Sequence, residues 1–178
     1  RELEKEWRDI YARTEANSFS LSGAAKGARK LHNVALIYIN ASGAGDAAGL
    51  AFSHFDRADN MTDRQAAMGI LVHGTSAERE AALDIFYNRY KDDALVLDKW
   101  FQTQALAFHP DTVEQVEELA RHKDFTFANP NRARSVFGAF SANQWAFNRK
   151  DGKGYRMLAD AIIALDKLNP QTAARFVP

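Results

Sequence analysis

Hydrophobic residues recur along this chain at intervals of three or four. Trp7 and Tyr11 are four residues apart, and Leu31, Ala35 and Ile39 repeat that interval. Side chains at this spacing lie on one face of an α-helix and can pack against a neighbouring element. The interval returns in four later segments, at residues 83–90, 97–104, 113–120 and 155–165. The pattern predicts a chain built from amphipathic helices.

Residues 34–39 form the longest apolar run, and by themselves they are also compatible with a buried strand. The helical spacing extends back toward Ala24, and a segment of that length favours a helix. No alternation of hydrophobic and polar residues is long enough to indicate a strand. All four prolines lie after His109, so the first half of the chain lacks the residue that most strongly interrupts helices. The prediction is an all-α fold.

Two Asn-Pro pairs mark predicted helix starts. The first opens the stretch NPNRARSVFGAF at 129–140, and the second opens NPQTAAR at 169–175. An asparagine side chain accepts hydrogen bonds from the free N–H groups of a first helical turn, and proline fits there because its missing N–H would have no partner. The first stretch predicts a helix to about Phe140, then another through Phe147. Asp93 is predicted to cap a helix in the same way.

Predicted helices of roughly 12–18 residues, joined by short turns, are typical of stacked antiparallel helix pairs. The pairs share no readable repeated motif, so we expect an irregular superhelix of the HEAT or armadillo type. No segment indicates a domain boundary, and residues 1–178 are interpreted as one all-α domain. The chain stops at Pro178, shortly after Pro170 begins a helix, so the domain is expected to be truncated at this end.

Composition narrows the classes of protein that fit this fold. The 23 basic and 23 acidic residues cancel to a formal net charge of +0, which lacks the positive potential of a nucleic-acid-binding surface. No apolar run reaches the roughly 20 residues that span a bilayer, and no secretory signal opens the chain. The absence of cysteine excludes disulfides, thiolate zinc sites and cysteine nucleophiles. These properties favour a cytoplasmic globular protein that binds neither nucleic acid nor membrane.

The histidines show no spacing typical of a metal site. No two are closer than 13 residues, whereas zinc ligands on one helix lie four residues apart, as in HExxH. Isolated surface or capping histidines are the favoured interpretation, and a metal site assembled from distant helices is the alternative. The chain also lacks the G-x-S-x-G elbow of serine hydrolases. The five histidines are His32, His54, His73, His109 and His122.

A charged cluster surrounds residues 60–62 and has two interpretations. It could provide a pair of acids for catalysis. Alternatively, Asn60 or Thr62 caps a helix whose first turn accommodates Asp63 against the helix dipole. Capping is the favoured interpretation. The cluster consists of Asp56, Arg57, Asp59, Asp63 and Arg64. The three tryptophans and twelve phenylalanines fall on helical stripes and are assigned to the core.

Arginines lie beside apolar anchors in both Asn-Pro stretches: Arg132 and Arg134 in the first, and Arg175 in the second. A guanidinium is suited to planar, bidentate recognition of a carboxylate or a peptide carbonyl. In the structural alternative, one arginine is solvated or salt-bridged and the other covers apolar surface with its stem. Spacing alone favours the structural alternative.

Four sequence blocks occur in the order ADNMTDR (58–64), DALVLDKWF (93–101), and then the two Asn-Pro stretches. Together they resemble the bacterial aminopeptidase N family, which are M1-type zinc metalloaminopeptidases. The match runs from about Trp7 to the end of the chain. The resemblance implies that this is the family's C-terminal helical domain and not its catalytic domain.

In that family the catalytic domain carries HExxH with a downstream glutamate as zinc ligands, and the GAMEN motif that binds the substrate's amino terminus. This chain contains neither motif. The resemblance therefore assigns no catalytic or metal-binding residue and no cofactor here, and it implies zinc only in the parent enzyme's catalytic domain. The isolated segment is not expected to hydrolyse peptides.

The resemblance also implies a role for the segment. The family's C-terminal domain caps the catalytic cleft and restricts entry to small peptides, so the implied partners are the catalytic domain of the same polypeptide and short peptide substrates. Family residues matching Arg134, Gln171 and Arg175 face the enclosed chamber, which makes these three the implied substrate-binding residues. Gln171 and Arg175 are four residues apart and are expected to share one helix face.

Two functions are therefore carried forward. The leading hypothesis is the non-catalytic, chamber-forming domain of a zinc aminopeptidase N, which gates and orients peptides. The alternative is a free-standing α-helical scaffold that binds peptides or proteins.

Overall fold

A computed structural model describes residues 2–16 and 18–177, and these ranges contain helices and no strand. The prediction of an all-α chain is confirmed. The helices are α1 (Glu4–Thr14), α2 (Gly23–Ala41), α3 (Ala47–Arg57), α4 (Met61–Leu71), α5 (Ala77–Tyr90), α6 (Ala94–Ala105), α7 (Thr112–Arg121), α8 (Pro130–Ala133), the π-helical segment η1 (Arg134–Gly138), α9 (Ala139–Ala142), α10 (Gln144–Phe147), α11 (Lys153–Asp166) and α12 (Pro170–Ala174).

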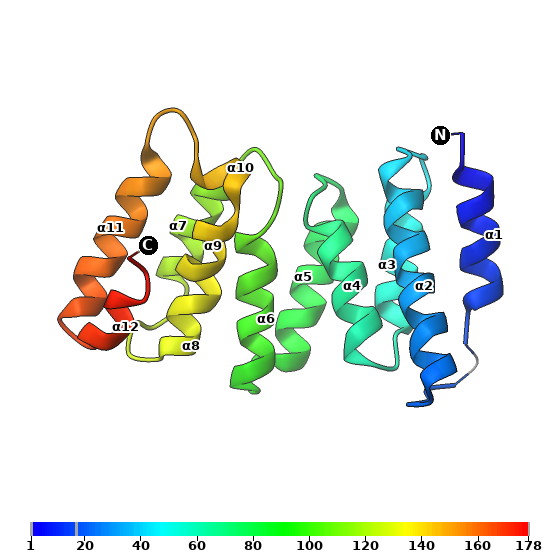
Figure 1. Ribbon diagram of the computed structural model, residues 1–178, viewed down its shortest axis with the longest axis horizontal. Helices are drawn as coiled ribbons and strands as arrows, with labels where there is room; N and C mark the ends of the chain where they lie inside the picture. Colours follow the sequence, from blue (N-terminus) through cyan, green and yellow to red (C-terminus); the bar gives the residue numbers. More distant parts are fainter. Residues whose placement is uncertain (1, 17, 178) are drawn as a thin grey trace. The chain divides into compact units, whose positions relative to one another are not determined.

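The chain divides into two compact units, residues 1–84 and 85–178, and the division falls within α5. In the first unit α1 packs antiparallel to α2, and α3 packs antiparallel to α4 (Figure 1). In the second unit α6 packs against α7 and η1, and α11 packs against α12. This division does not test the prediction of one domain over residues 1–178, which stays a prediction.

Four predicted helix starts are confirmed by their capping hydrogen bonds. The side chain of Asn60 accepts a hydrogen bond from the backbone N–H of Asp63, and Asp93 accepts from the second and third residues after it. Asn129 and Asn169 cap α8 and α12, each with proline in the first turn. The capping interpretation of the charged cluster is therefore confirmed at Asn60.

Each unit has its own hydrophobic core. Leu36, Ile39 and Phe55 are fully buried in the first unit, and Phe101 and Phe140 are fully buried in the second. The assignment of every tryptophan and phenylalanine to the core is wrong. Trp145 is 56% exposed because it lies in the single turn of α10, whose one buried residue is Ala146. Phe19 and Phe108 are also exposed.

The connection from α10 to α11 brings two backbone segments close together. Gly152 has a φ of +70°, a left-handed conformation that glycine adopts without steric cost. Two residues later, a Cβ atom built on Gly154 would lie only 2.2 Å from the carbonyl oxygen of Phe147. Gly154 is itself buried at the start of α11. Because Gly154 has no Cβ atom, the start of α11 can pack directly against the end of α10.

The helix that follows Asn129 contains a π turn. It begins as α8, changes to π geometry over Arg134–Gly138 and continues as α9 to Ala142, close to the predicted end at Phe140. Short π segments within α-helices frequently occur at functional sites. Here the π turn begins at one of the three predicted substrate-binding residues.

None of the helices in residues 2–16 and 18–177 is both long enough and apolar enough to cross a membrane.

Candidate functional site

A groove in the second unit brings together two of the three predicted substrate-binding residues. Arg134 and Arg175 both line it, and its volume is about 800 Å³. Gln171 is exposed and is not among the residues that line this groove. Most of the lining is apolar, including Leu106, Ala142, Leu158, Ile162 and Phe176. We call this feature the arginine groove.

Helix ends position the two arginines of the groove. Arg134 follows the last residue of α8 and begins the π turn, and Arg175 follows the last residue of α12. Both side chains are exposed, and neither forms an ion pair with a described residue. Among the described residues, the Arg134 guanidinium donates one hydrogen bond, to Oδ1 of Asn131, and this bond is long at 3.5 Å. Both guanidinium groups are thus available to an anionic or carbonyl-bearing ligand.

Phe176 connects the apolar side of the groove to the core. Its ring packs against the buried cluster of Ala133, Leu165 and Ala173. A Cβ atom built on Gly138 would lie at ordinary contact distances, 3.5 Å from Cε1 of Phe176 and 3.6 Å from Cβ of Arg134, so a methyl group would fit beside the ring. The groove thus combines two cations with an apolar wall fixed to the core.

Arg132 has a different environment from its neighbour Arg134. It is 4% exposed, forms an ion pair with Asp98 and donates hydrogen bonds to the backbone oxygens of Asp124 and Ala94. Its guanidinium carbon also lies 4.7 Å from the centre of the Phe101 ring. Arg132 is therefore a structural residue that holds α8 against α6, as the structural alternative proposed for one arginine of the pair.

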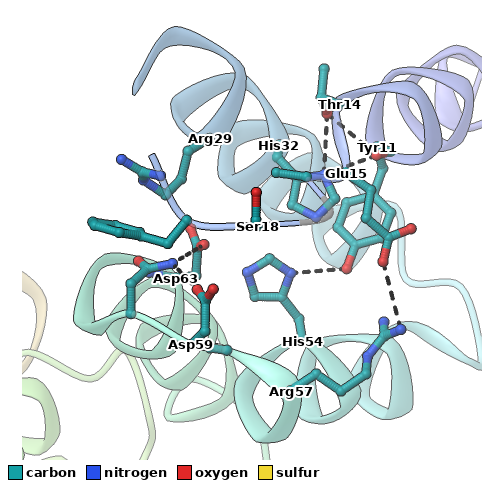
Figure 2. A pocket seen from close by; sticks show the side chains of 14 residues that line it. Tyr11, Thr14, Glu15, Ser18, Arg29, His32, His54, Arg57, Asp59 and Asp63 are labelled. Atoms are coloured by element: carbon teal, nitrogen blue, oxygen red, sulfur yellow. Dashed lines mark hydrogen bonds and ion pairs between the residues drawn. The ribbon is translucent and has the colours of Figure 1, made fainter. Parts of the chain in front are cut away.

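A second pocket lies in the first unit, where helices α1, α2 and α3 meet. Its volume is about 210 Å³, and it is lined by His32 and His54 together with charged residues (Figure 2). The two imidazole rings are 5.0 Å apart between centroids, and both residues are 7% exposed. Interpreting all five histidines as isolated is therefore wrong for this pair. We call this feature the histidine pocket.

Tyr11 connects the two imidazoles. Its hydroxyl lies 2.9 Å from Nδ1 of His54, and its backbone oxygen lies 2.8 Å from Nδ1 of His32. A carbonyl oxygen can only accept, so Nδ1 of neutral His32 carries the proton and donates it. Nε2 of His32 is then an acceptor, and it makes no hydrogen bond to a described residue. Nε2 of His54 is buried and has no hydrogen-bond partner among the described residues.

Comparison with known proteins identifies the kind of domain. The whole chain, residues 1–178, matches the family described as "Domain of unknown function (DUF3458_C) ARM repeats". The chain belongs to this family. The match confirms the prediction of an all-α, armadillo-like fold.

Three bacterial proteins named Aminopeptidase N are similar to this ARM-repeat domain over nearly all of its length. The protein of Caulobacter vibrioides is 37% identical over 172 residues, or 96% of this chain and 20% of the relative. The protein of Haemophilus influenzae is 34% identical over 176 residues, which cover 98% of this chain and 20% of the relative. The protein of Escherichia coli is 33% identical over 177 residues, which cover 99% of this chain and 20% of the relative. The chain spans about a fifth of the length of these relatives.

A solved structure shows the same relationship in three dimensions. The crystal structure of Legionella pneumophila aminopeptidase A in complex with aspartic acid is similar to this ARM-repeat domain with a TM-score of 0.90 and 31% sequence identity. The similarity covers 98% of this chain and 22% of that chain. The resemblance to the aminopeptidase N family is therefore confirmed.

The ARM-repeat domain offers no zinc site among its described residues. No group of three or more histidine, aspartate or glutamate side chains in residues 2–16 and 18–177 could hold a metal ion. The histidine pair by itself falls short of the three protein ligands of a catalytic zinc site.

The other three histidines have different environments. Nδ1 of His109 and Nδ1 of His122 each accept a hydrogen bond from the backbone N–H of the residue two positions later. His73 is exposed. His73 therefore has the expected surface position, whereas His109 is buried and His122 packs against the rings of Trp100 and Phe101.

Burial makes both imidazoles of the histidine pocket harder to protonate. Burial, with a smaller contribution from the neighbouring His32, lowers the pKa of His54 to about 4. Burial also lowers the pKa of His32, although the backbone oxygen of Tyr11 and the carboxylate of Asp63 oppose that shift. Both rings are consequently neutral at pH 7. In contrast, burial raises the pKa of the Tyr11 hydroxyl to about 12, so the phenol keeps its proton.

We expect the folded domain to lose stability as the pH falls from 7 to 5. The pKa of His54 is lower in the folded chain than the usual 6.5, so the unfolded chain binds more protons between pH 6.5 and pH 4. Stability is therefore greatest above pH 6.5, and His54 alone should remove about 2 kcal/mol from the free energy of unfolding by pH 5. Urea unfolding followed by circular dichroism at several pH values measures this.

The matched control for this pH dependence is His54→Phe, which keeps a planar ring and cannot titrate. Its unfolding free energy should change less between pH 7 and pH 5 than that of the natural sequence, by about the 2 kcal/mol assigned to His54. The contribution of His32 should remain in both proteins. Parallel pH profiles for the two proteins would show that His54 does not titrate as described.

Proposed function

We propose that this ARM-repeat domain is the non-catalytic C-terminal domain of a zinc-dependent aminopeptidase N, and that its arginine groove gates and orients peptide substrates. The observation that carries the proposal is the arrangement of Arg134 and Arg175, two exposed arginines without ion-pair partners in the described ranges, on one apolar groove. The similarity to bacterial aminopeptidases N over nearly the whole chain supports the same assignment.

The chemistry of the groove suits the part of a peptide that follows the scissile bond. A guanidinium forms paired hydrogen bonds with a carboxylate and also donates to backbone carbonyls. The apolar wall made by Leu158, Ile162 and Phe176 can bury a hydrophobic side chain of the same peptide. A peptide held at both points would present its amino-terminal end in a restricted set of orientations, which lowers the entropic part of the reaction barrier.

Hydrolysis itself belongs to another part of the parent protein in this proposal. The described residues do not fit a zinc site, so no step of the reaction is assigned to them. The purified 178-residue chain should show no turnover of an amino-acid arylamide in the presence of zinc. Measurable turnover that follows this chain through purification would contradict the proposal.

The orienting role predicts the effect of Arg175→Ala in the parent enzyme. The variant should lower kcat/KM for short peptides by about tenfold, because one charge-assisted interaction contributes roughly 1.5 kcal/mol. An arylamide has no residue beyond the scissile bond and should be cleaved at nearly the same rate as before. Steady-state kinetics on both substrates measures the difference.

Arg156→Ala is the matched control, since Arg156 is an exposed arginine of α11 that does not line the groove. It should leave both substrates unaffected. Equal losses of peptide and arylamide turnover in Arg175→Ala would rule out the orienting role. If Arg175→Ala changes neither substrate and the isolated chain binds peptides, the alternative of a peptide-binding scaffold is favoured.

A further inference from the structure

A further groove lies in the first unit, between α2 and α4, which lie side by side (Figure 1). Its volume is about 570 Å³, and α2 supplies most of the residues that line it. Three of these residues, Lys26, Arg29 and Lys30, are cations, and none of the described lining residues is acidic. We call this feature the basic groove. It lies in a different unit from the arginine groove, so the proposed peptide-orienting function does not involve it.

Large apolar side chains of the basic groove are open to solvent. Phe19 is 49% exposed, Ile37 is 50% exposed and Leu21 is 67% exposed. The Arg29 guanidinium carbon lies 4.9 Å from the centre of the Phe19 ring, and Arg29 also donates a hydrogen bond of 3.3 Å to the backbone oxygen of Ser20. Arg29 therefore holds the segment that carries Phe19 and Leu21 beside α2. An exposed apolar patch bordered by polar groups marks an interaction surface.

The two lysines of the basic groove have no acidic partner in the described part of the chain. Neither Lys26 nor Lys30 forms an ion pair with a described residue. They are four residues apart on α2, so they lie on one face of the helix. Asn33 of the groove donates a hydrogen bond of 2.7 Å to the carboxylate of Asp63, which does not itself line the groove. Three lining cations less this one carboxylate leave an excess of two positive charges, so the groove favours an acidic partner.

The shape of the basic groove favours a protein segment over a membrane. A lipid surface is met by apolar side chains that project from a protein, whereas a groove receives side chains that project from a partner. The Phe19 ring also lies against a guanidinium, and inserting the ring into lipid would bring that charge with it. From Lys26 to Ile37, α2 rises about 16 Å, which is about three helical turns. A partner helix of this length presents apolar side chains along the groove at intervals of three and four residues.

A partner in the same polypeptide suits the modest contact that the basic groove offers. Exposed ion pairs contribute little, and a free partner loses translational freedom on binding, so its affinity would be weak. A segment of the same polypeptide is instead present at an effective concentration on the order of millimolar. The chain spans about a fifth of the length of its relatives, so most of the proposed parent enzyme lies outside these 178 residues.

We propose that the basic groove docks an acidic amphipathic segment of the parent polypeptide, outside these 178 residues. Carboxylates of the segment pair with Lys26 and Lys30, and its apolar side chains cover Phe19 and Ile37. The contact holds the first unit of the domain to another part of the enzyme. Docking of this kind rests on the proposed function only in that the chain is one domain of a larger polypeptide. Loss of the orienting role in the kinetic test of Arg175→Ala would leave the contact standing, because the two grooves are separate.

Zero-length cross-linking of the full-length parent enzyme tests the contact. A water-soluble carbodiimide joins a lysine amine to a carboxylate that touches it, and mass spectrometry identifies the joined residues. We expect Lys26 or Lys30 to be joined to an aspartate or glutamate outside residues 1–178. Lys153, whose amine lies 3.0 Å from Glu117, should be joined to Glu117 and shows that the reagent has reacted.

Other cross-linking patterns would overturn the proposal. These are links of Lys26 and Lys30 only to residues within 1–178, and the lack of any link from either lysine beside a clear link of Lys153 to Glu117. A mixture of isotope-labelled and unlabelled enzyme separates links within one polypeptide from links between copies. Links between copies would also overturn the proposal and assign the groove to a second copy of the enzyme.

Acetylation of lysine amines in the parent enzyme measures whether the basic groove is covered. Ile37→Asn removes an apolar anchor and should raise the acetylation rates of Lys26 and Lys30 about tenfold, because burial of one isoleucine side chain corresponds to about that factor in binding. Leu31→Asn is the matched control, since Leu31 is exposed on the same helix and does not line the groove. It should leave both rates unchanged.

Both variants change exposed positions, and circular dichroism checks that they fold. Acetylation rates in Ile37→Asn equal to those of the natural sequence, or an equal rise in Leu31→Asn, would contradict the proposal. Slow acetylation that requires added phosphatidylglycerol vesicles would contradict it too and assign the groove to a membrane surface.

Discussion

Replacing Arg132 with alanine is expected to destabilise the second unit by about 3–5 kcal/mol. The guanidinium is 4% exposed and pairs with Asp98, whose side chain is itself only 14% exposed. Removing the arginine leaves this partly buried carboxylate without its counter-ion. It also removes the hydrogen bonds that the guanidinium donates to the backbone oxygens of Asp124 and Ala94 and creates a cavity beside Phe101.

Arg134→Ala provides the matched control, because it removes the same side chain two residues away from an exposed position. Its long hydrogen bond to Asn131 should contribute little, so the control should change the free energy of unfolding by less than about 0.5 kcal/mol. Urea unfolding of both variants gives the comparison. A loss in Arg132→Ala no larger than that in Arg134→Ala would show that the buried ion pair does not hold α8 in place.

Replacing Gly154 with alanine is expected to be comparably damaging, with a loss of about 3 kcal/mol or more. The new methyl group would lie 2.2 Å from the carbonyl oxygen of Phe147, and this oxygen belongs to the backbone. A side-chain neighbour could rotate away, whereas here α10 or α11 must move as a whole. Overpacking that forces a backbone shift typically costs about 1–3 kcal/mol, and contact with main-chain atoms places Gly154 at or above the upper end.

Gly27→Ala is the control for the intrinsic effect of the same substitution. Gly27 lies within α2, and a Cβ atom there would meet no other atom within 4 Å. Alanine should stabilise this helix by about 0.5–1 kcal/mol, because glycine loses more backbone freedom on folding. Thermal unfolding should therefore move in opposite directions for the two variants. A melting temperature for Gly154→Ala at or above that of the natural sequence would refute the predicted clash.

Local features of this fold could be predicted from the sequence. The helical spacing around Tyr11 and Ile39 and the caps at Asn60 and Asn129 depend on residues within one or two turns of each other, and each is confirmed. The prediction from helical spacing that Trp145 is buried was wrong. An apolar residue on a helical stripe is buried only when another element covers it, and the single turn of α10 leaves this ring exposed.

Contacts between distant segments were beyond this kind of prediction. The histidine pocket takes Tyr11 from α1, His32 from α2 and His54 from α3, and no spacing in the sequence relates the three. The arginine groove was located in part, because the resemblance selected Arg134 and Arg175, which do share a groove. It also selected Gln171, which is exposed and does not line the groove.

The π turn at Arg134–Gly138 has a consequence for how residues are matched between relatives. A π turn bonds each residue to the fifth one along instead of the fourth, so it accommodates one more residue than an α turn. Each residue of an α-helix turns the chain by about 100°. A relative with an unbroken α-helix here would have one residue fewer, so its sequence would align with this chain through a one-residue gap. If that gap were placed on the wrong side of Gly138, Arg134 would be paired with a residue of the relative that lies on a different face of the helix. Equivalent positions within this turn are therefore best assigned by superposing coordinates.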